Sequence, residues 1–88
     1  MKQKQSLVIV GIHISNRFKQ VAKLQKIFTK FGCQIKTRLG LHRASEDFCA
    51  MDGLILLEMF GDAIKIREFF DAVNSLQNLE VKKMTFKI

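Results

Sequence analysis

The sequence predicts an α+β domain in which a four-stranded antiparallel sheet carries two helices on one face. Two segments, residues 18–31 and 63–76, place apolar residues three and four apart, which is typical of amphipathic helices. The remaining apolar segments are short and rich in β-branched residues, which favours strands. Four strands are expected at residues 6–15, 33–42, 53–60 and 79–87. The length of 88 residues fits a single domain, over residues 1–88.

The first strand is expected to lead into the first helix through a polar turn. Ser15 or Asn16 is a natural N-cap, because its side-chain oxygen can accept a hydrogen bond from the first helical turn. Gly32 is expected to end the helix in a left-handed conformation. The expected apolar stripe of this helix comprises Phe18, Val21, Leu24, Phe28 and Phe31.

Residues 33–60 are expected to form a hairpin around which the other elements pack. Its first arm alternates, with Gln34, Lys36, Arg38 and His42 on one side, and Ile35, Thr37, Leu39 and Leu41 on the other. The basic residues indicate an edge strand protected against pairing with another chain. Residues 43–52 are expected to form a long loop, and long loops are often functional. The second arm, residues 53–60, is the most apolar run and is expected to be a central strand.

The second helix is expected to begin at Asp62, which can cap it, and to end at Asn78. Its apolar stripe comprises Ala63, Ile66, Phe69, Phe70, Val73 and Leu76. In the last strand the alternation slips at Lys82-Lys83, which predicts a bulge or a strand end there.

The order β-α-β-β-α-β with right-handed crossovers favours the ferredoxin-like arrangement, with strand order 4-1-3-2 and both helices on one face. Val8, Val10, Ile12 and Ile14 then face the helices, as do Ile55, Leu57 and Met59. Leu7, Ile9, Leu54 and Leu56 fall on the face that no helix covers. An apolar cluster of this kind usually marks an interface, so we expect a homo-oligomer, dimer or tetramer.

The charge of +7 is concentrated in the first half of the chain. Residues 1–45 contain ten Lys/Arg and no acid, whereas residues 46–88 contain five Lys/Arg and all eight acids. A basic stripe runs along the first helix through Lys19, Lys23, Lys26 and Lys30. The default interpretation is a solvated helix face. The alternative is a nucleic-acid-associated protein that uses this stripe.

The composition excludes several classes of function. The apolar stretch Leu7 to Ile14 is too short to cross a bilayer, so no membrane segment is expected. Cys33 and Cys49 form no disulfide framework or CxxC pair, which favours a reduced, cytoplasmic location; Cys33 is expected to be a small core residue. No residue set brings nucleophile and base together, so no enzyme is expected. Whether the protein binds a cofactor is left unknown by the sequence.

The predicted topology brings two strand ends and the 43–52 loop to one rim of the sheet. A small polar or anionic ligand is expected there, because a long polar loop beside donor side chains is typical of a binding site. The candidate ligand-binding residues are His13, Arg38, His42 and Cys49. Arg38 could hold a carboxylate with two parallel hydrogen bonds. His13, His42 and Cys49 could together bind a transition metal, which is the alternative for this rim. No metal site is predicted, because none of these residues shows metal-site spacing.

Several short motifs resemble a small family of bacterial proteins named iron-only hydrogenase system regulators. The motifs are Arg38-Leu-Gly-Leu-His42, Cys49, Gly53-Leu-Ile-Leu-Leu-Glu58, Gly61-Asp62 and Val81-Lys-Lys-Met-Thr-Phe86. This family is similar in fold to ACT domains and to the ligand-binding half of nickel-responsive repressors. The resemblance implies an ACT-like homo-oligomer with a regulatory role, and it names no ligand. Ser15-Asn16-Arg17 departs from the Gly or Asp that ACT domains place in this turn, which leaves amino-acid binding unsupported.

Overall fold

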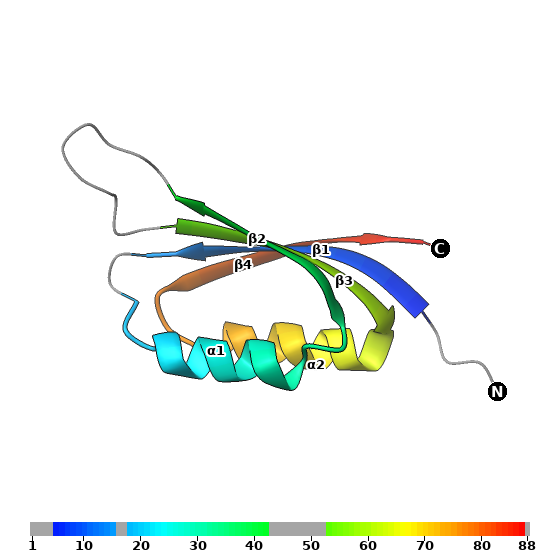
Figure 1. Cartoon of the computed structure of the whole chain (residues 1–88), viewed down its shortest axis with the longest axis horizontal. Coiled ribbons are helices and arrows are strands. Elements are labelled where there is room, and N and C mark those ends of the chain that lie inside the picture. Colours follow the sequence, from blue (N-terminus) through cyan, green and yellow to red (C-terminus); the bar gives the residue numbers. More distant parts are fainter. Residues whose placement is uncertain (1–4, 16–17, 43–52, 88) are drawn as a thin grey trace.

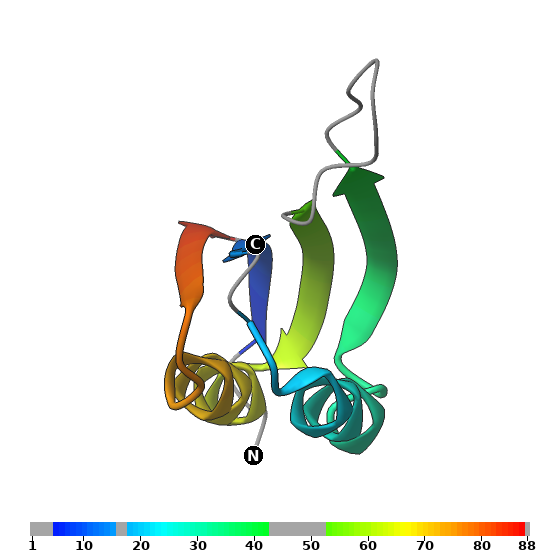
Figure 2. The same ribbon diagram turned by 90° about the vertical axis from the view of Figure 1, so that its left-hand side faces the viewer.

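A computed structural model of the chain describes residues 5–15, 18–42 and 53–87, and it confirms the predicted α+β class. The elements are β1 (Gln5–Ile14), α1 (Val21–Lys30), β2 (Ile35–His42), β3 (Gly53–Asp62), α2 (Ala63–Asn74) and β4 (Leu79–Phe86). The strands pair antiparallel in the order β2-β3-β1-β4, which is the predicted 4-1-3-2 order read from the other edge. Both helices lie on the same side of the sheet (Figures 1 and 2).

The core lies between the sheet and the two helices. Alternate residues of β1 and β3 point into it as predicted: Val10, Ile12 and Met59 have no exposed surface. Phe69 of α2 sits at the centre, with its ring centroid 6.0 Å from that of Phe28 and 5.6 Å from that of Phe31. Burying these aromatic rings against the central strands fixes the helices on this face of the sheet.

The first helix begins later than predicted. Its N-cap is Gln20, which makes no capping side-chain hydrogen bond. Ser15 instead donates its backbone N–H to Asn78 and accepts one from Phe18, while Asn16 lies outside the described residues. Val21 is 57% exposed and therefore does not belong to the apolar stripe. At the other end of α1, Gly32 was predicted to be left-handed, but its φ is not positive, and a series of i to i+3 hydrogen bonds makes the turn into β2.

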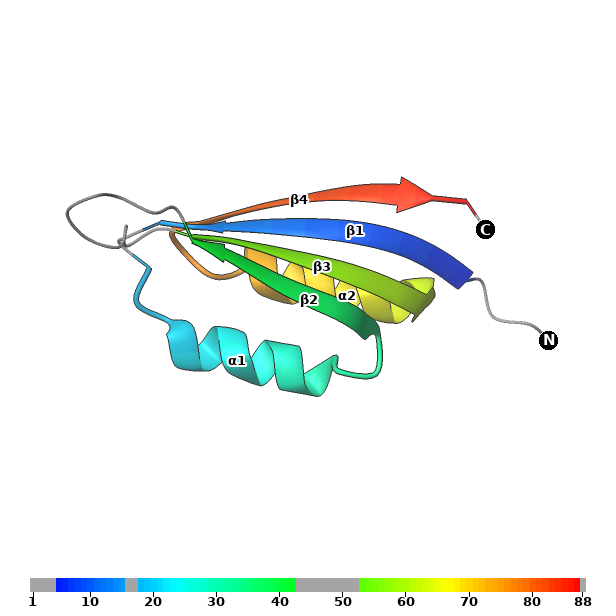
Figure 3. The same ribbon diagram turned by 45° about the horizontal axis from the view of Figure 1, so that its top comes forward.

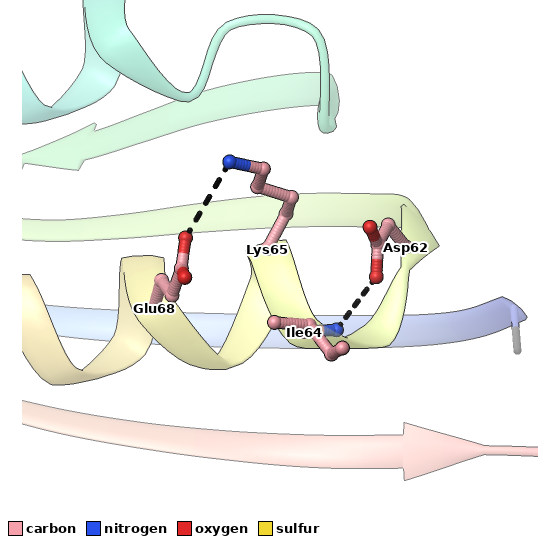
Figure 4. Close-up of polar contacts among 4 residues, drawn as sticks. All are labelled: Asp62, Ile64, Lys65 and Glu68. Atoms are coloured by element: carbon pink, nitrogen blue, oxygen red, sulfur yellow. Dashed lines mark hydrogen bonds and ion pairs between the residues drawn. The ribbon is translucent and has the colours of Figure 1, made fainter. Parts of the chain in front are cut away.

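The second helix begins as predicted. The N–H of Ile64 donates to Asp62 Oδ1 at 2.9 Å, so Asp62 is the N-cap (Figure 4). One turn on, Lys65 Nζ lies 3.7 Å from Glu68 Oε1 on the helix surface. The helix ends at Asn74 rather than at Asn78, which adopts a φ of +66° in the turn before β4. Asparagine tolerates this conformation better than most residues.

The two edge strands differ from the prediction in their register. β4 pairs with β1 without interruption, so the bulge predicted at Lys82-Lys83 is wrong. The irregularity lies in β2, where the register shifts between Ile35 and Thr37. One extra residue at this point reverses the facing of the chain, so Ile35 points to the core while Thr37 lies on the opposite side.

Both edge strands turn a cation toward the helices. The guanidinium carbon of Arg38 lies 4.6 Å from the ring centroid of Phe28, and Lys83 Nζ lies 4.6 Å from that of Phe70. A cation over an aromatic face is favourable, and the aliphatic stems cover the sides of the core.

Cys33, expected in the core, is exposed. No helix in the described part of the chain has the length and apolar character needed to cross a membrane.

Candidate functional site

The face of the sheet opposite the helices is here called the open face, and it comes toward the viewer in Figure 3. The register places side chains from all four strands on it. The register arranges them in rows across the sheet, one row for each outward residue of β1. The rows are Phe60, Leu7 and Phe86; Glu58, Ile9 and Met84; Leu56, Gly11 and Lys82; and Leu54, His13 and Glu80. β2 adds Thr37 beside Glu58, and Leu39 beside Leu56.

An apolar band crosses the open face. The predicted interface residues Leu7, Ile9, Leu54 and Leu56 all lie on it and are half-buried. The structure adds four more exposed apolar side chains, Leu39, Phe60, Met84 and Phe86. Sequence reasoning missed the edge-strand members, because their faces depend on the position of the bulge and on the register of β4.

Charged residues flank the apolar band on opposite sides. On one side, Thr37 Oγ1 donates a hydrogen bond of 2.9 Å to Glu58 Oε1. On the other, Lys82 Nζ lies 3.7 Å from Glu80 Oε2. Because β1 runs between β3 and β4, Glu58 and Lys82 are separated by two strand spacings, roughly 9.5 Å, before any offset along the strands.

A hollow opens over Gly11 in the middle of the open face. Its volume is about 250 Å³, and it is lined by Ile9, Gly11, Leu56, Lys82, Lys83 and Met84. A second hollow of about 180 Å³ adjoins it, lined by Gly11, His13, Leu54, Glu80 and Lys82. A Cβ added to Gly11 would lie 3.6 Å from Leu56 Cδ2, an ordinary contact distance. The backbone therefore has room for alanine here, and the glycine keeps the surface hollow.

The structure separates the residues of the predicted ligand site. His13 lies on the open face, whereas Arg38 pairs with Leu57 and stacks on Phe28 on the helix side. These two side chains therefore do not meet within one chain. His42 ends β2, with its side chain outside the described part of the chain, and Cys49 lies outside the described residues. Within the described ranges, no group of three His, Cys, Asp or Glu residues could hold a metal ion.

A larger cavity, of about 420 Å³, lies between the start of α1 and the turn before β4. It is lined by Lys19, Gln20, Gln77 and Asn78. Gln20 Oε1 is buried and has no hydrogen-bond partner among the residues that the structure describes. Sequence reasoning missed this cavity, because only the folded chain brings residues 19–20 and 77–78 together.

The basic stripe lies largely on the surface of α1. Lys23, Lys26 and Lys30 are exposed along the helix, while Lys19 precedes it and lines the cavity just described. Lys30 Nζ lies 5.5 Å from the ring centroid of Phe31. No acidic residue occurs within α1 to neutralise these charges.

The fold and the open face together define a small ferredoxin-like α+β domain. The chain is similar in fold to the uncharacterized protein TM1266 from Thermotoga maritima, with a TM-score of 0.79 over 96% of this chain and 100% of that one, at 18% sequence identity. It also aligns with CPII, a nitrogen regulatory PII-like protein from Thiomonas intermedia K12, bound to ADP, AMP and bicarbonate. That alignment covers 96% of this chain and 99% of that one at 12% identity, with a TM-score of only 0.47. No family model and no curated protein match the chain.

Proposed function

We propose that this chain is a small regulatory binding module that works as a homo-oligomer assembled through its open face. The apolar band across that face carries the proposal, because contiguous apolar patches on proteins usually mark an interaction site. Four strands about 4.8 Å apart and some eight residues long give a planar footprint of roughly 500 Å². This footprint is of the same order as the roughly 800 Å² that each partner buries in a standard interface.

The ligand site belongs at the polar end of this face. His13, Glu80 and Lys82 offer an imidazole, a carboxylate and an ammonium group around the smaller hollow. These groups suit a small polar or anionic ligand, which a second copy on the open face would cover. Ligand binding would then alter the strength of assembly, which is how such a module can regulate. Binding rather than catalysis is proposed, because no described residue set pairs a nucleophile with a base.

The assembly is tested with Leu56→Lys. This substitution places a charge in the centre of the apolar band, where burial without a partner is strongly unfavourable. Sedimentation should then show a smaller species than wild type. Ile64→Lys is the matched control, because Ile64 is 68% exposed on α2, away from the open face, and should leave the size unchanged. A monomeric wild type at high micromolar concentration would refute the proposed assembly.

The ligand site is tested by thermal stabilisation with divalent metals, nucleotides, amino acids and small carboxylates, since a ligand that binds only the folded state raises the unfolding temperature. His13→Ala should abolish any stabilisation found. Lys19→Ala, in the separate cavity beside α1, should retain it. The opposite pattern would move the ligand site to that cavity.

The regulated system follows only from the resemblance to hydrogenase system regulators. We therefore propose a hydrogenase system as the first target, tested by deleting the gene and measuring hydrogenase activity and transcript levels in the host. Unchanged hydrogenase activity and transcript levels would reject this target and would leave the proposed assembly unaffected. A nucleic-acid role is a second candidate, favoured by the exposed lysines of α1 with no acid among them.

A further inference from the structure

We infer that two copies pack open face to open face about a two-fold axis along the apolar band, so that Glu58 of each copy meets Lys82 of the other and a partner leucine fills the hollow over Gly11. This inference rests on the proposed assembly and specifies its geometry. In a two-fold interface the same patch is used twice, so a contact between two different residues occurs in two equivalent copies. The open face must therefore be complementary to itself.

Charge complementarity supports this axis. Glu58 lies on one flank of the apolar band and Lys82 on the other, with β1 between them. A two-fold rotation about an axis along the band exchanges the flanks, so each carboxylate faces an ammonium group. Neither residue is committed to the core: Glu58 bonds only to Thr37 in the described part of the chain, and Lys82 is 80% exposed beside Glu80.

The edges of the sheet are poorly suited to pairing with a second copy. β2 carries the register shift near Ile35, and β4 carries Lys82 and Lys83 side by side. Bulges and lysines at edges both disfavour the addition of another strand. Face-to-face packing is therefore favoured over extension of the sheet.

The hollow over Gly11 adds a steric match. Gly11 lies in the same row as Leu56, and β2 places Leu39 next in that row. The rotation that exchanges Glu58 and Lys82 carries the Gly11 side of the band onto the leucine side. With strands about 4.8 Å apart and outward residues about 6.8 Å apart along each strand, this rotation places Leu56 of one copy nearest the apolar hollow of about 250 Å³ in the other.

Charge reversal tests the register. Glu58→Lys and Lys82→Glu should each weaken self-association, because each creates two like-charge contacts per dimer. Mixing the two variants should restore a dimer, because both contacts in the mixed species are again between opposite charges. We expect each variant alone to associate at least about tenfold more weakly than wild type and the mixture to recover most of that loss. Circular dichroism and unfolding temperature verify that each variant folds.

Glu68→Lys, on the exposed surface of α2, is the matched charge-reversal control and should leave association unchanged. A mixture that stays monomeric, or single variants that associate as wild type, would overturn the inferred register. If the Leu56→Lys variant is nevertheless smaller than the wild-type oligomer, the proposed open-face assembly stands and only the inferred register is wrong.

Filling the hollow tests the steric part. Gly11→Leu should block the partner side chain and weaken association by about tenfold or more. Gly40→Leu is the control, because Gly40 pairs with Ile55 on the helix side, and a Cβ added to it would meet no atom within 4 Å. Wild-type association of Gly11→Leu would overturn the assignment of the hollow to a partner leucine.

Discussion

Replacing Arg38 with alanine should lower the free energy of unfolding by about 1 kcal/mol. The guanidinium lies 4.6 Å from the Phe28 centroid on an exposed edge strand, and a cation–π contact at such a site contributes about 0.5–1 kcal/mol. Loss of the aliphatic stem over the ring adds to this. For a domain of this size the unfolding temperature should fall by roughly 4–8 °C per kcal/mol.

The assay is thermal unfolding at one fixed protein concentration, because the unfolding temperature of an oligomer depends on concentration. Arg38→Met keeps an aliphatic stem over Phe28 without the charge and should lose only part of the stability. Lys36→Ala removes an exposed cation from the same strand and should change stability by less than about 0.5 kcal/mol. If Arg38→Ala unfolds like wild type but no longer responds to ligand, the side chain serves the ligand, as the sequence alone suggested.

Two further predictions concern the helices. Asp62→Ala should lower the free energy of unfolding in urea by about 1 kcal/mol, because it removes the hydrogen bond from the Ile64 N–H. Asp62→Asn should retain most of the cap. An equal loss of stability in both variants would show that the negative charge of Asp62, rather than its hydrogen bond, stabilises the helix. Changing all four lysines of the basic stripe to glutamine should alter stability by under about 1 kcal/mol if the stripe is only solvated. Binding of generic DNA that falls steeply with salt and disappears in this variant would instead favour the nucleic-acid function.

The alternation of the two central strands could be predicted from the sequence because both strands are constrained on both sides. Each of Val10 and Leu57 has a neighbouring strand at either edge and a helix over one face, so a shift of one residue would expose the core. The same reasoning predicted which face of the sheet stays open. The cap at Asp62 was predictable for a local reason, since its side chain needs only the next turn of its own helix.

The edge strands could not be predicted in the same way, because one side of each has no neighbour to fix its register. The register shift between Ile35 and Thr37 could not be recognised from the sequence, because the side chains of this segment alternate as in a regular strand. It decides that Arg38 covers Phe28 instead of joining His13, and so it separates the predicted ligand residues. The start of α1 was also missed. The N-cap is Gln20, which makes no capping side-chain hydrogen bond and so carries no local signal, while Ser15 donates its backbone N–H to the distant carbonyl of Asn78.

Gly11 is the position where folding and the proposed assembly favour different residues. A glycine in a strand weakens it by roughly 0.5–1 kcal/mol relative to alanine, and the backbone here would accept a Cβ at ordinary contact distance from Leu56. The isolated chain should therefore gain stability from Gly11→Ala. The same methyl group would reduce the hollow into which we propose that a partner side chain projects. A residue that costs the monomer stability while shaping the centre of an exposed apolar face is best explained by what that face binds.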